Sequence, residues 1–293
     1  MDALNARLHS GVVEARLHHS LEEFRALAWP LYRRDAVVNT IELTLLLRDT
    51  WPADSLLLTV WDGAEPVGAA IQTPPYPLVC NGIPVDAHRL VATHLAGIRP
   101  GLRGVRGRLD SALGFAEAWR SVTGGTGIMA TNERLYRLGT LRPPLRVAGA
   151  AREATGTDRS VLVDWMERFF VETLGDQRDE PAGEAFVDTA GAVGDRFILW
   201  VVDGVPVSMA MLRAPAADVS RIGPVFTPRD RRGRGYGSAV TSAAVESAHR
   251  TGVQDVVLFA DLANPTSNGV YQRIGFDAVC DSVRIEFAAP SSD

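Results

Sequence analysis

The sequence predicts a mixed α/β fold that is present in two similar copies. Two segments about 140 residues apart, 56–71 and 198–211, each place an Asp-Gly pair between two apolar, β-rich runs. A helical stretch precedes each of these hairpins, at residues 21–49 and 158–174. An arginine- and glycine-rich turn, a helix and a strand follow each hairpin. The matching order of the flanking elements indicates an internal duplication.

The boundary between the copies is expected near residues 141–145, where Arg142-Pro143-Pro144 interrupts regular structure. This division predicts an N-terminal domain of residues 1–142 and a C-terminal domain of residues 143–293. Each is expected to form a mixed, mainly antiparallel twisted sheet flanked by helices, which places the chain in the α/β (α+β) class.

The elements expected in the second half follow from periodicity, turn residues and caps. Thr157 or Asp158 is a suitable cap for its first helix, and Pro265 suits the first turn of its last helix. The expected strands span residues 146–154, 196–202, 205–212, 220–227, 255–260, 276–280 and 283–287, the expected helices span residues 158–174, 235–251 and 265–274, and residues 175–191 form an irregular acidic segment with at most a short helix.

Composition narrows the functional classes. The 293 residues are 46% hydrophobic and 22% charged, as in soluble globular proteins, and a net charge of -5 gives no reason to expect nucleic acid or an anionic membrane as partner. The two cysteines, Cys80 and Cys280, lack the spacing of a metal site or a disulfide framework. With no signal peptide or membrane span, the sequence predicts a cytoplasmic protein without a metal.

A turn in the second half has the properties of an anion site. Residues 222–237 read as an extended run, an arginine- and glycine-rich turn and the start of a helix. Glycines let the backbone approach a ligand closely, and the free N–H groups of a first helical turn favour a phosphate. The segment contains neither Gly-Lys-Ser/Thr nor GxGxxG, so neither a P-loop nor a dinucleotide fold is indicated.

The turn residues Arg232, Gly235 and Gly237 form Arg-x-x-Gly-x-Gly, which resembles the acyl-CoA-binding motif of the GNAT superfamily of N-acetyltransferases. Downstream, Asn264 ends a strand, Tyr271 lies seven residues later, and Gly275-Phe276 ends the next helix, which is similar to the second signature of that family. The resemblance covers roughly residues 145–290 and implies tandem GNAT-like domains with acetyl-CoA as cosubstrate.

The resemblance also implies individual roles. The strand that ends at Val225, Phe226 and Thr227 would part from its neighbour and pair its backbone with the pantetheine arm. Asn264 would contact the pantetheine or shape the loop beneath it, and Tyr271 would protonate the departing thiolate. The remaining residues expected to bind the cofactor lie in the turn and the helix start: Arg232, Gly233, Arg234, Gly235, Tyr236, Gly237 and Ser238.

The general base is not identified by the sequence. Asp261, at the end of a strand beside the expected cleft, is the best single candidate, and Glu172, Glu180 and Glu184 remain alternatives. Each also has an ordinary interpretation as a solvated or capping carboxylate.

The first half is expected to be a degenerate copy that does not catalyse. Its equivalent turn is taken as residues 100–107, where Arg-x-x-Gly-x-Gly is missing, and Tyr136 follows Asn132 by four residues instead of seven. Such a copy would cover the acceptor cleft, bind a partner or form a dimer surface, with Tyr136 as a second catalytic tyrosine left as an alternative.

The predicted function is acetyl-CoA-dependent N-acetyl transfer to a primary amine of a small molecule or a peptide, by direct attack. A transferase for a bulkier acyl-CoA and a non-catalytic CoA sensor or scaffold remain alternatives. A homodimer is left open, and neither nucleic acid nor membrane is expected as a partner.

Overall fold

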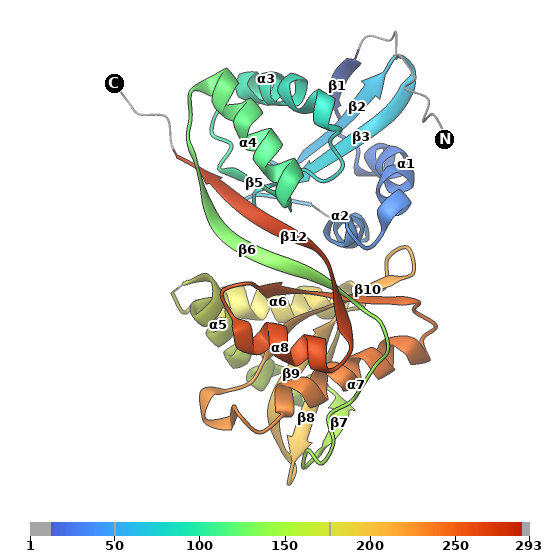
Figure 1. The fold of residues 1–293 in the computed structure, drawn as a ribbon, viewed down its shortest axis with the longest axis vertical. Helices are drawn as coiled ribbons and strands as arrows, with labels where there is room; N and C mark the ends of the chain where they lie inside the picture. The colour runs from blue at the N-terminus through green and yellow to red at the C-terminus, as the bar shows by residue number, and fades with distance from the viewer. Residues whose placement is uncertain (1–12, 50, 176, 289–293) are drawn as a thin grey trace, which may run out of the picture. The chain divides into compact units, whose positions relative to one another are not determined.

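The computed structural model describes residues 13–49, 51–175 and 177–288, and these divide into two units (Figure 1). One unit takes the described residues of Met1–Asn132 together with those of Asp281–Asp293, and the other takes those of Glu133–Cys280. The described residues 281–288 therefore belong to the unit that contains β1 (Val13–Leu17).

In the unit that begins the chain, two helices pack against the sheet in one apolar cluster. Val91 of α3 and Phe115 of α4 are fully buried there, while Phe24 of α1 and Leu43 of α2 are buried outside this cluster. Its strands lie in the order β1 (Val13–Leu17), β2 (Leu56–Asp62), β3 (Glu65–Gln72), β4 (Leu78–Val79), β5 (Gly104–Arg108) and the end of β12 (Phe276–Phe287), and its helices are α1 (Leu21–Tyr32), α2 (Thr40–Leu46), α3 (His88–Ile98) and α4 (Leu109–Thr123).

The second unit has helices on both faces of its sheet. Val240 and Ala244 of α7 belong to one buried cluster, and Met166 of α5 and Val187 of α6 belong to another. Its strands lie in the order β6 (Gly127–Leu138), β11 (Asp255–Asp261), β10 (Val219–Phe226), β9 (Val205–Leu212), β8 (Arg196–Val202) and β7 (Ala150–Glu153), and its helices are α5 (Arg159–Leu174), α6 (Glu180–Ala192), α7 (Tyr236–Arg250) and α8 (Pro265–Arg273).

The order of elements repeats. The series from β1 to β6 has the same sequence of strands and α-helices as the series from β7 to β12, so β4 corresponds to β10, α3 to α7, β5 to β11 and α4 to α8. Within each series one pair of strands is parallel, β4 with β5 and β10 with β11, and the other neighbours of known register are antiparallel. The predicted mixed, mainly antiparallel fold in two copies is confirmed.

The last strand of each series pairs with the other series. Residues 133–137 of β6 pair with β11, and residues 282–286 of β12 pair with β5. The division therefore differs from the boundary expected between residues 142 and 143. Arg142-Pro143-Pro144 lies in the loop that links the two series along the chain, but strand pairing is set by residues more than 100 positions apart.

Local elements also differ in places from the expectation. Residues 175–191 were expected to be irregular with at most a short helix, and the helix found there is longer: α6 spans the 13 residues Glu180–Ala192. Asp179 accepts a hydrogen bond from Ala182 N–H at its start, and Pro181 lies in the first turn. The two expected final strands form one strand, β12. Within the described residues no helix is both long and apolar enough to cross a membrane.

Candidate functional site

The parallel strands β10 and β11 part at one end. Their pairing ends at Ile222 with Leu258, after which β10 continues along β9 and pairs Val225 with Ala210. Over the same stretch β11 continues along β6 as far as Asp261. Beyond Ile222 the backbone of β10 is therefore no longer paired with β11, which is the separation expected for the strand that ends at Val225–Thr227.

Helix α7 begins directly after this strand, at a turn of two left-handed glycines. Gly233 has φ 76° and Gly235, the N-cap, has φ 82°, a region that side chains other than glycine seldom adopt. The first helical bond runs from Ala239 N–H to Gly235 O at 3.0 Å. No side chain caps the helix, so the N–H groups of Tyr236, Gly237 and Ser238 point outward as in an anion site.

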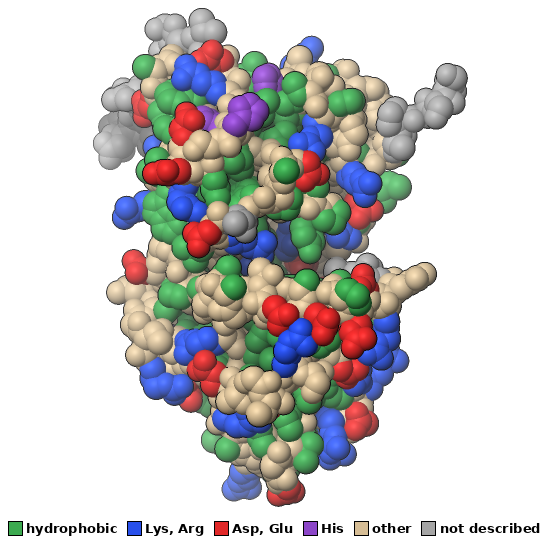
Figure 2. All heavy atoms as spheres, turned by 180° about the vertical axis from the view of Figure 1, so that it is seen from behind, with side chains coloured by type: hydrophobic (Ala, Val, Ile, Leu, Met, Phe, Trp, Pro, Cys, Tyr) green, Lys and Arg blue, Asp and Glu red, His purple; other side chains and the backbone are tan. Residues whose placement is uncertain are grey.

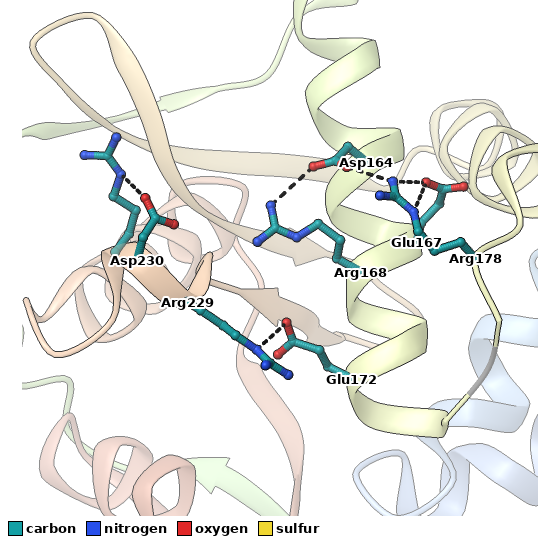
Figure 3. A network of polar contacts seen from close by, with 8 residues as sticks. Asp164, Glu167, Arg168, Glu172, Arg178, Arg229 and Asp230 are labelled. Atoms are coloured by element: carbon teal, nitrogen blue, oxygen red, sulfur yellow. Dashed lines mark hydrogen bonds and ion pairs between the residues drawn. The ribbon is translucent and has the colours of Figure 1, made fainter.

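Two arginines of the turn are tied to α5 by one carboxylate. Arg232 donates to Glu172 over 2.6 Å and to Thr227 O over 2.9 Å. Arg229 donates to the second oxygen of Glu172 over 3.2 Å, as Figure 3 shows. The guanidinium of Arg232 also lies 6.0 Å from the ring centre of Phe226. These contacts join the end of β10, the turn and α5 into one framework.

The other expected ligands of the turn differ in what they offer. Arg234 is exposed and, within the described chain, forms no ion pair, so its guanidinium is available to a ligand. Tyr236 is buried, which leaves only its backbone N–H for binding, whereas Ser238 is partly exposed. The hydroxyl of Thr241, one turn further along the helix, donates to Gly237 O over 2.8 Å.

Helix α8 is capped by the asparagine that the family motif contains. Asn264 Oδ1 accepts from Ser267 N–H over 3.0 Å, which leaves its amide N–H groups for a ligand. Asp261, the first candidate for the general base, accepts from Ala263 N–H over 2.8 Å and closes the turn that leads into α8. The structure thus gives Asp261 a capping contact.

Tyr271 lies at the end of the second turn of α8 and is partly exposed. Its ring packs edge-on against Phe276 at 6.2 Å and against the cluster that includes Val240 of α7. Burial of the ring raises the pKa of Tyr271 to about 12. Among the described residues none forms a hydrogen bond with its hydroxyl, so this proton is available to a ligand.

Of the three alternative bases, Glu172 and Glu184 form ion pairs and Glu180 is exposed to solvent. Partial burial acts to raise the pKa of Glu172, but the hydrogen bonds and charges of Arg232 and Arg229 outweigh it and lower that pKa below the usual value. Glu184 pairs with Arg159 over 2.9 Å, and Glu180 is exposed in the first turn of α6. Glu172 is therefore better suited to hold the turn than to accept a proton.

Glu172→Gln is expected to tighten binding of acetyl-CoA, the ligand that the sequence predicts, by about threefold at low salt. Glutamine keeps an oxygen for Arg232 but removes the charge that competes with phosphate. Calorimetry at low and high salt measures this, and the gain should fade as salt screens it. Asp188→Asn, which removes a carboxylate paired with Arg159 at 2.9 Å, is the control. Weaker binding in low salt would contradict the prediction.

The turn that corresponds to the anion site in the first series is not residues 100–107. Those residues form the end of the loop after α3 and most of β5, so the expected equivalence was wrong. The true counterpart lies between β4 and α3, at residues 80–87. The sequence missed it because β4 has only two residues and the following loop is rich in proline and glycine.

In this first series the parting of the strands is bridged by a side chain. The pairing of β4 with β5 ends at Val79 with Arg106, and Asn81 follows. Its Oδ1 accepts from Arg108 N–H over 2.7 Å, and its Nδ2 donates to Glu42 over 3.0 Å. No such role for Asn81 was expected from the sequence.

Tyr136, considered as a second catalytic tyrosine, lies in strand β6 and is 1% exposed. Its hydroxyl is 2.7 Å from Asn268 Oδ1. Tyr136 thus belongs to a strand, whereas Tyr271 belongs to helix α8.

In the described part of the chain we find neither a cluster of metal ligands nor a large patch of one charge on the face shown in Figure 2. Among the described residues no group of three or more His, Cys, Asp or Glu side chains is arranged to hold a metal ion. Basic and acidic side chains are interspersed over the face of the molecule in Figure 2, in keeping with the net charge of -5.

Comparison with known proteins gives a family match. The model of the acetyltransferase (GNAT) family matches residues 160–276. No curated protein matches the chain.

Several solved structures share the fold. A tandem GNAT protein from the clavulanic acid biosynthesis pathway is 13% identical with a TM-score of 0.62, covering 96% of this chain and 100% of its own. A GNAT-family acetyltransferase from Colwellia psychrerythraea is 11% identical with a TM-score of 0.61, covering 94% and 98%. A GCN5-related N-acetyltransferase from Sphaerobacter thermophilus is 16% identical with a TM-score of 0.59, covering 94% and 95%. At these identities the likeness concerns the fold.

Proposed function

Because residues 160–276 form a domain of the acetyltransferase (GNAT) family, we propose that the protein transfers an acetyl group from acetyl-CoA to a primary amine by direct attack. The observation that carries this proposal is the start of α7, where three outward backbone N–H groups follow two left-handed glycines at the end of a strand that parts from its neighbour. A small molecule and a peptide are both suitable acceptors. We also propose a cytoplasmic location, supported by a sequence whose two cysteines, Cys80 and Cys280, lack the spacing of a disulfide framework.

The residues fit a CoA thioester in three places. The backbone of Val225, Phe226 and Thr227 would pair with the amides of the pantetheine arm, and the N–H groups from Gly233 to Ser238 would hold the diphosphate. Arg234 is free to add a charge-assisted hydrogen bond, and Arg232 supports the turn through Thr227 O. Asn264 would contact the pantetheine through its remaining amide N–H groups.

In the proposed mechanism Tyr271 donates a hydrogen bond to the sulfur that leaves. When bound, acetyl-CoA supplies an activated acyl group. With a pKa of about 12, the tyrosine is fully protonated at neutral pH. Complete transfer of its proton to a thiolate of ordinary pKa about 8.5 would be uphill by roughly 5 kcal/mol. The tyrosine therefore keeps its proton, and it stabilises the negative charge that develops on sulfur as the amine nitrogen bonds to the acyl carbon and the bond from that carbon to sulfur breaks.

The proton from the amine needs an acceptor other than Glu172. Since the carboxylate of Glu172 is held by two arginines and that of Asp261 caps a turn, we propose that water near Asp261 accepts the proton first. Asp261 remains the best candidate among the side chains, because it is exposed at the end of β11 beside the parted strands.

The test is calorimetry with acetyl-CoA, followed by release of free thiol in the presence of a panel of amines. Gly235→Ala should weaken acetyl-CoA binding at least tenfold, because a side chain at φ 82° distorts the turn and its Cβ would lie 3.0 Å from Val147. Gly252→Ala is the matched control, since Gly252 has φ 81° at the other end of α7 and open space around it.

The outcome distinguishes the alternatives. Absence of acetyl-CoA binding by the wild-type protein would contradict the proposal. Tight binding without thiol release would favour a CoA sensor or scaffold, and faster release from longer thioesters would favour a bulkier acyl group.

We propose that the first series is a non-catalytic copy. The amide of Asn81 occupies the gap between β4 and β5 and bonds to the backbone of Arg108 and to Glu42, groups that a pantetheine arm would need to approach. In addition, α4, the counterpart of α8, contains no tyrosine, and Tyr136 lies in the strand that follows it. One acetyl-CoA per chain is the expected stoichiometry.

A further inference from the structure

Asn268, in the first half of α8, is a point where three segments of the chain meet. Its Nδ2 donates to Asp261 O over 2.7 Å and to Asn264 O over 2.8 Å, and its Oδ1 is 2.7 Å from the hydroxyl of Tyr136. The side chain therefore joins α8 to the end of β11 and to β6.

The chemistry of these contacts fixes the direction of each hydrogen bond. Asp261 and Asn264 present carbonyl oxygens, which only accept, so both N–H groups of the Asn268 amide are used there. Its oxygen must then face Tyr136, and the tyrosine must be the donor. Tyr136 is 1% exposed, so water cannot readily replace this bond.

Few other contacts hold α8 in place. The helix has nine residues, and none of them is fully buried. Apolar burial, which normally fixes a helix on a sheet, is thus small here, and the polar contacts at its N-terminal end carry a large share of the restraint. Asn264 caps this end, and Asn268 ties it to the sheet.

Tyr271 follows Asn268 by three residues on the same helix, so the two side chains lie on adjacent turns of one side. The hydroxyl of Tyr271 must meet the leaving sulfur within hydrogen-bond distance, and a shift of α8 by about 1 Å is enough to cost much of the rate. A contact that holds the side chain of Asn268 in place therefore also holds the hydroxyl of Tyr271 in place.

We propose that Tyr136 is a positioning residue for Tyr271, acting through Asn268; this rests on the proposed role of Tyr271. Tyr136 belongs to β6, the last strand of the first series, and it pairs with Leu258 of β11 in the second unit. The non-catalytic copy thus supplies a side chain that orders the reaction centre of the other.

Tyr136→Phe tests the proposal in the full-length chain, since it keeps the buried ring and removes only the donor. We expect kcat to fall about tenfold, the KM for acetyl-CoA to stay within about twofold, and hydrogen exchange of residues 265–273 to become faster. Asn268→Ala should have the same effects, and the double variant should be no worse than either single variant.

Tyr32→Phe is the control, because Tyr32 is 0% exposed and its hydroxyl has no hydrogen-bond partner among the described residues. It should leave kcat and the exchange of residues 265–273 unchanged.

An unchanged kcat in Tyr136→Phe, while Tyr271→Phe lowers it, overturns the proposal and leaves the proposed function intact. A raised KM for acetyl-CoA with unchanged kcat also overturns it. Absence of transfer by the wild-type protein defeats the proposed function instead, and hydrogen exchange then decides: unchanged exchange of residues 265–273 in Tyr136→Phe overturns the positioning of α8.

Discussion

Tyr271→Phe is expected to lower kcat by roughly 10²- to 10³-fold while the KM for acetyl-CoA changes little. The phenylalanine keeps the ring contact with Phe276, so the helix stays in place and only the donor to the leaving sulfur is lost. The phosphates would be held elsewhere, at the start of α7, which is why binding should survive. Thiol release at saturating acetyl-CoA measures the effect.

The pH dependence provides a second measure. Because burial raises the pKa of Tyr271 to about 12, the group stays protonated through the whole range in which the protein can be assayed. Loss of this proton should therefore produce no alkaline limb below about pH 11, and any rise of rate with pH should reflect deprotonation of the amine.

Tyr76→Phe, at a tyrosine that is 61% exposed in the first unit, is the control and should leave kcat unchanged. A decrease of less than threefold in Tyr271→Phe would contradict the donor role.

In the second half of the chain, the elements that depend on short-range sequence patterns were predictable. The hairpin strands Arg196–Val202 and Val205–Leu212 were predicted with their correct ends, because Asp203 and Gly204 both take positive φ in the turn, as Asp-Gly pairs do. The glycine turn and the start of α7 follow from the same kind of short-range chemistry.

The contacts that organise the site were not predictable, because they join residues distant in sequence. Glu172 was considered as a base, but the structure pairs it with two arginines about 60 positions later. Asp261 was the first candidate, and the structure adds a local contact that the sequence did not indicate, because its Oδ1 accepts from Ala263 N–H. Nothing in the composition around Asn268 or Asn81 indicates that the first amide bonds to Tyr136 of β6 or that the second bonds to Glu42 of α2.

The sequence also did not show that β6 pairs with β11 and β12 with β5. Each of the two strands has the sequence of an ordinary final strand, and such a strand can pair antiparallel with a strand of its own series or of the other. Gly275 shows one local trace of the arrangement: it has φ 104°, and a Cβ there would collide with Thr140 O, where the chain after β6 passes.

Residues 143–293, produced alone, should fail to fold into a domain that binds acetyl-CoA. This fragment lacks β6, so β11 loses its antiparallel partner from Val257 to Asp261. Leu135 and Tyr136, each 1% exposed, also leave the core. Two such side chains at roughly 3 kcal/mol each, with ladder hydrogen bonds at about 1 kcal/mol each, rival the 5–15 kcal/mol that usually stabilises a domain.

Co-production of residues 1–142 with residues 143–293 is the decisive comparison, because each fragment then supplies the strand that the other lacks. The first fragment contains β6 for β11, and the second contains the end of β12 for β5. We expect the two fragments to copurify and to bind acetyl-CoA with the affinity of the intact chain. A cooperative thermal transition and acetyl-CoA binding by residues 143–293 alone would contradict this, and would mean that the strand exchange is dispensable for the acetyltransferase domain.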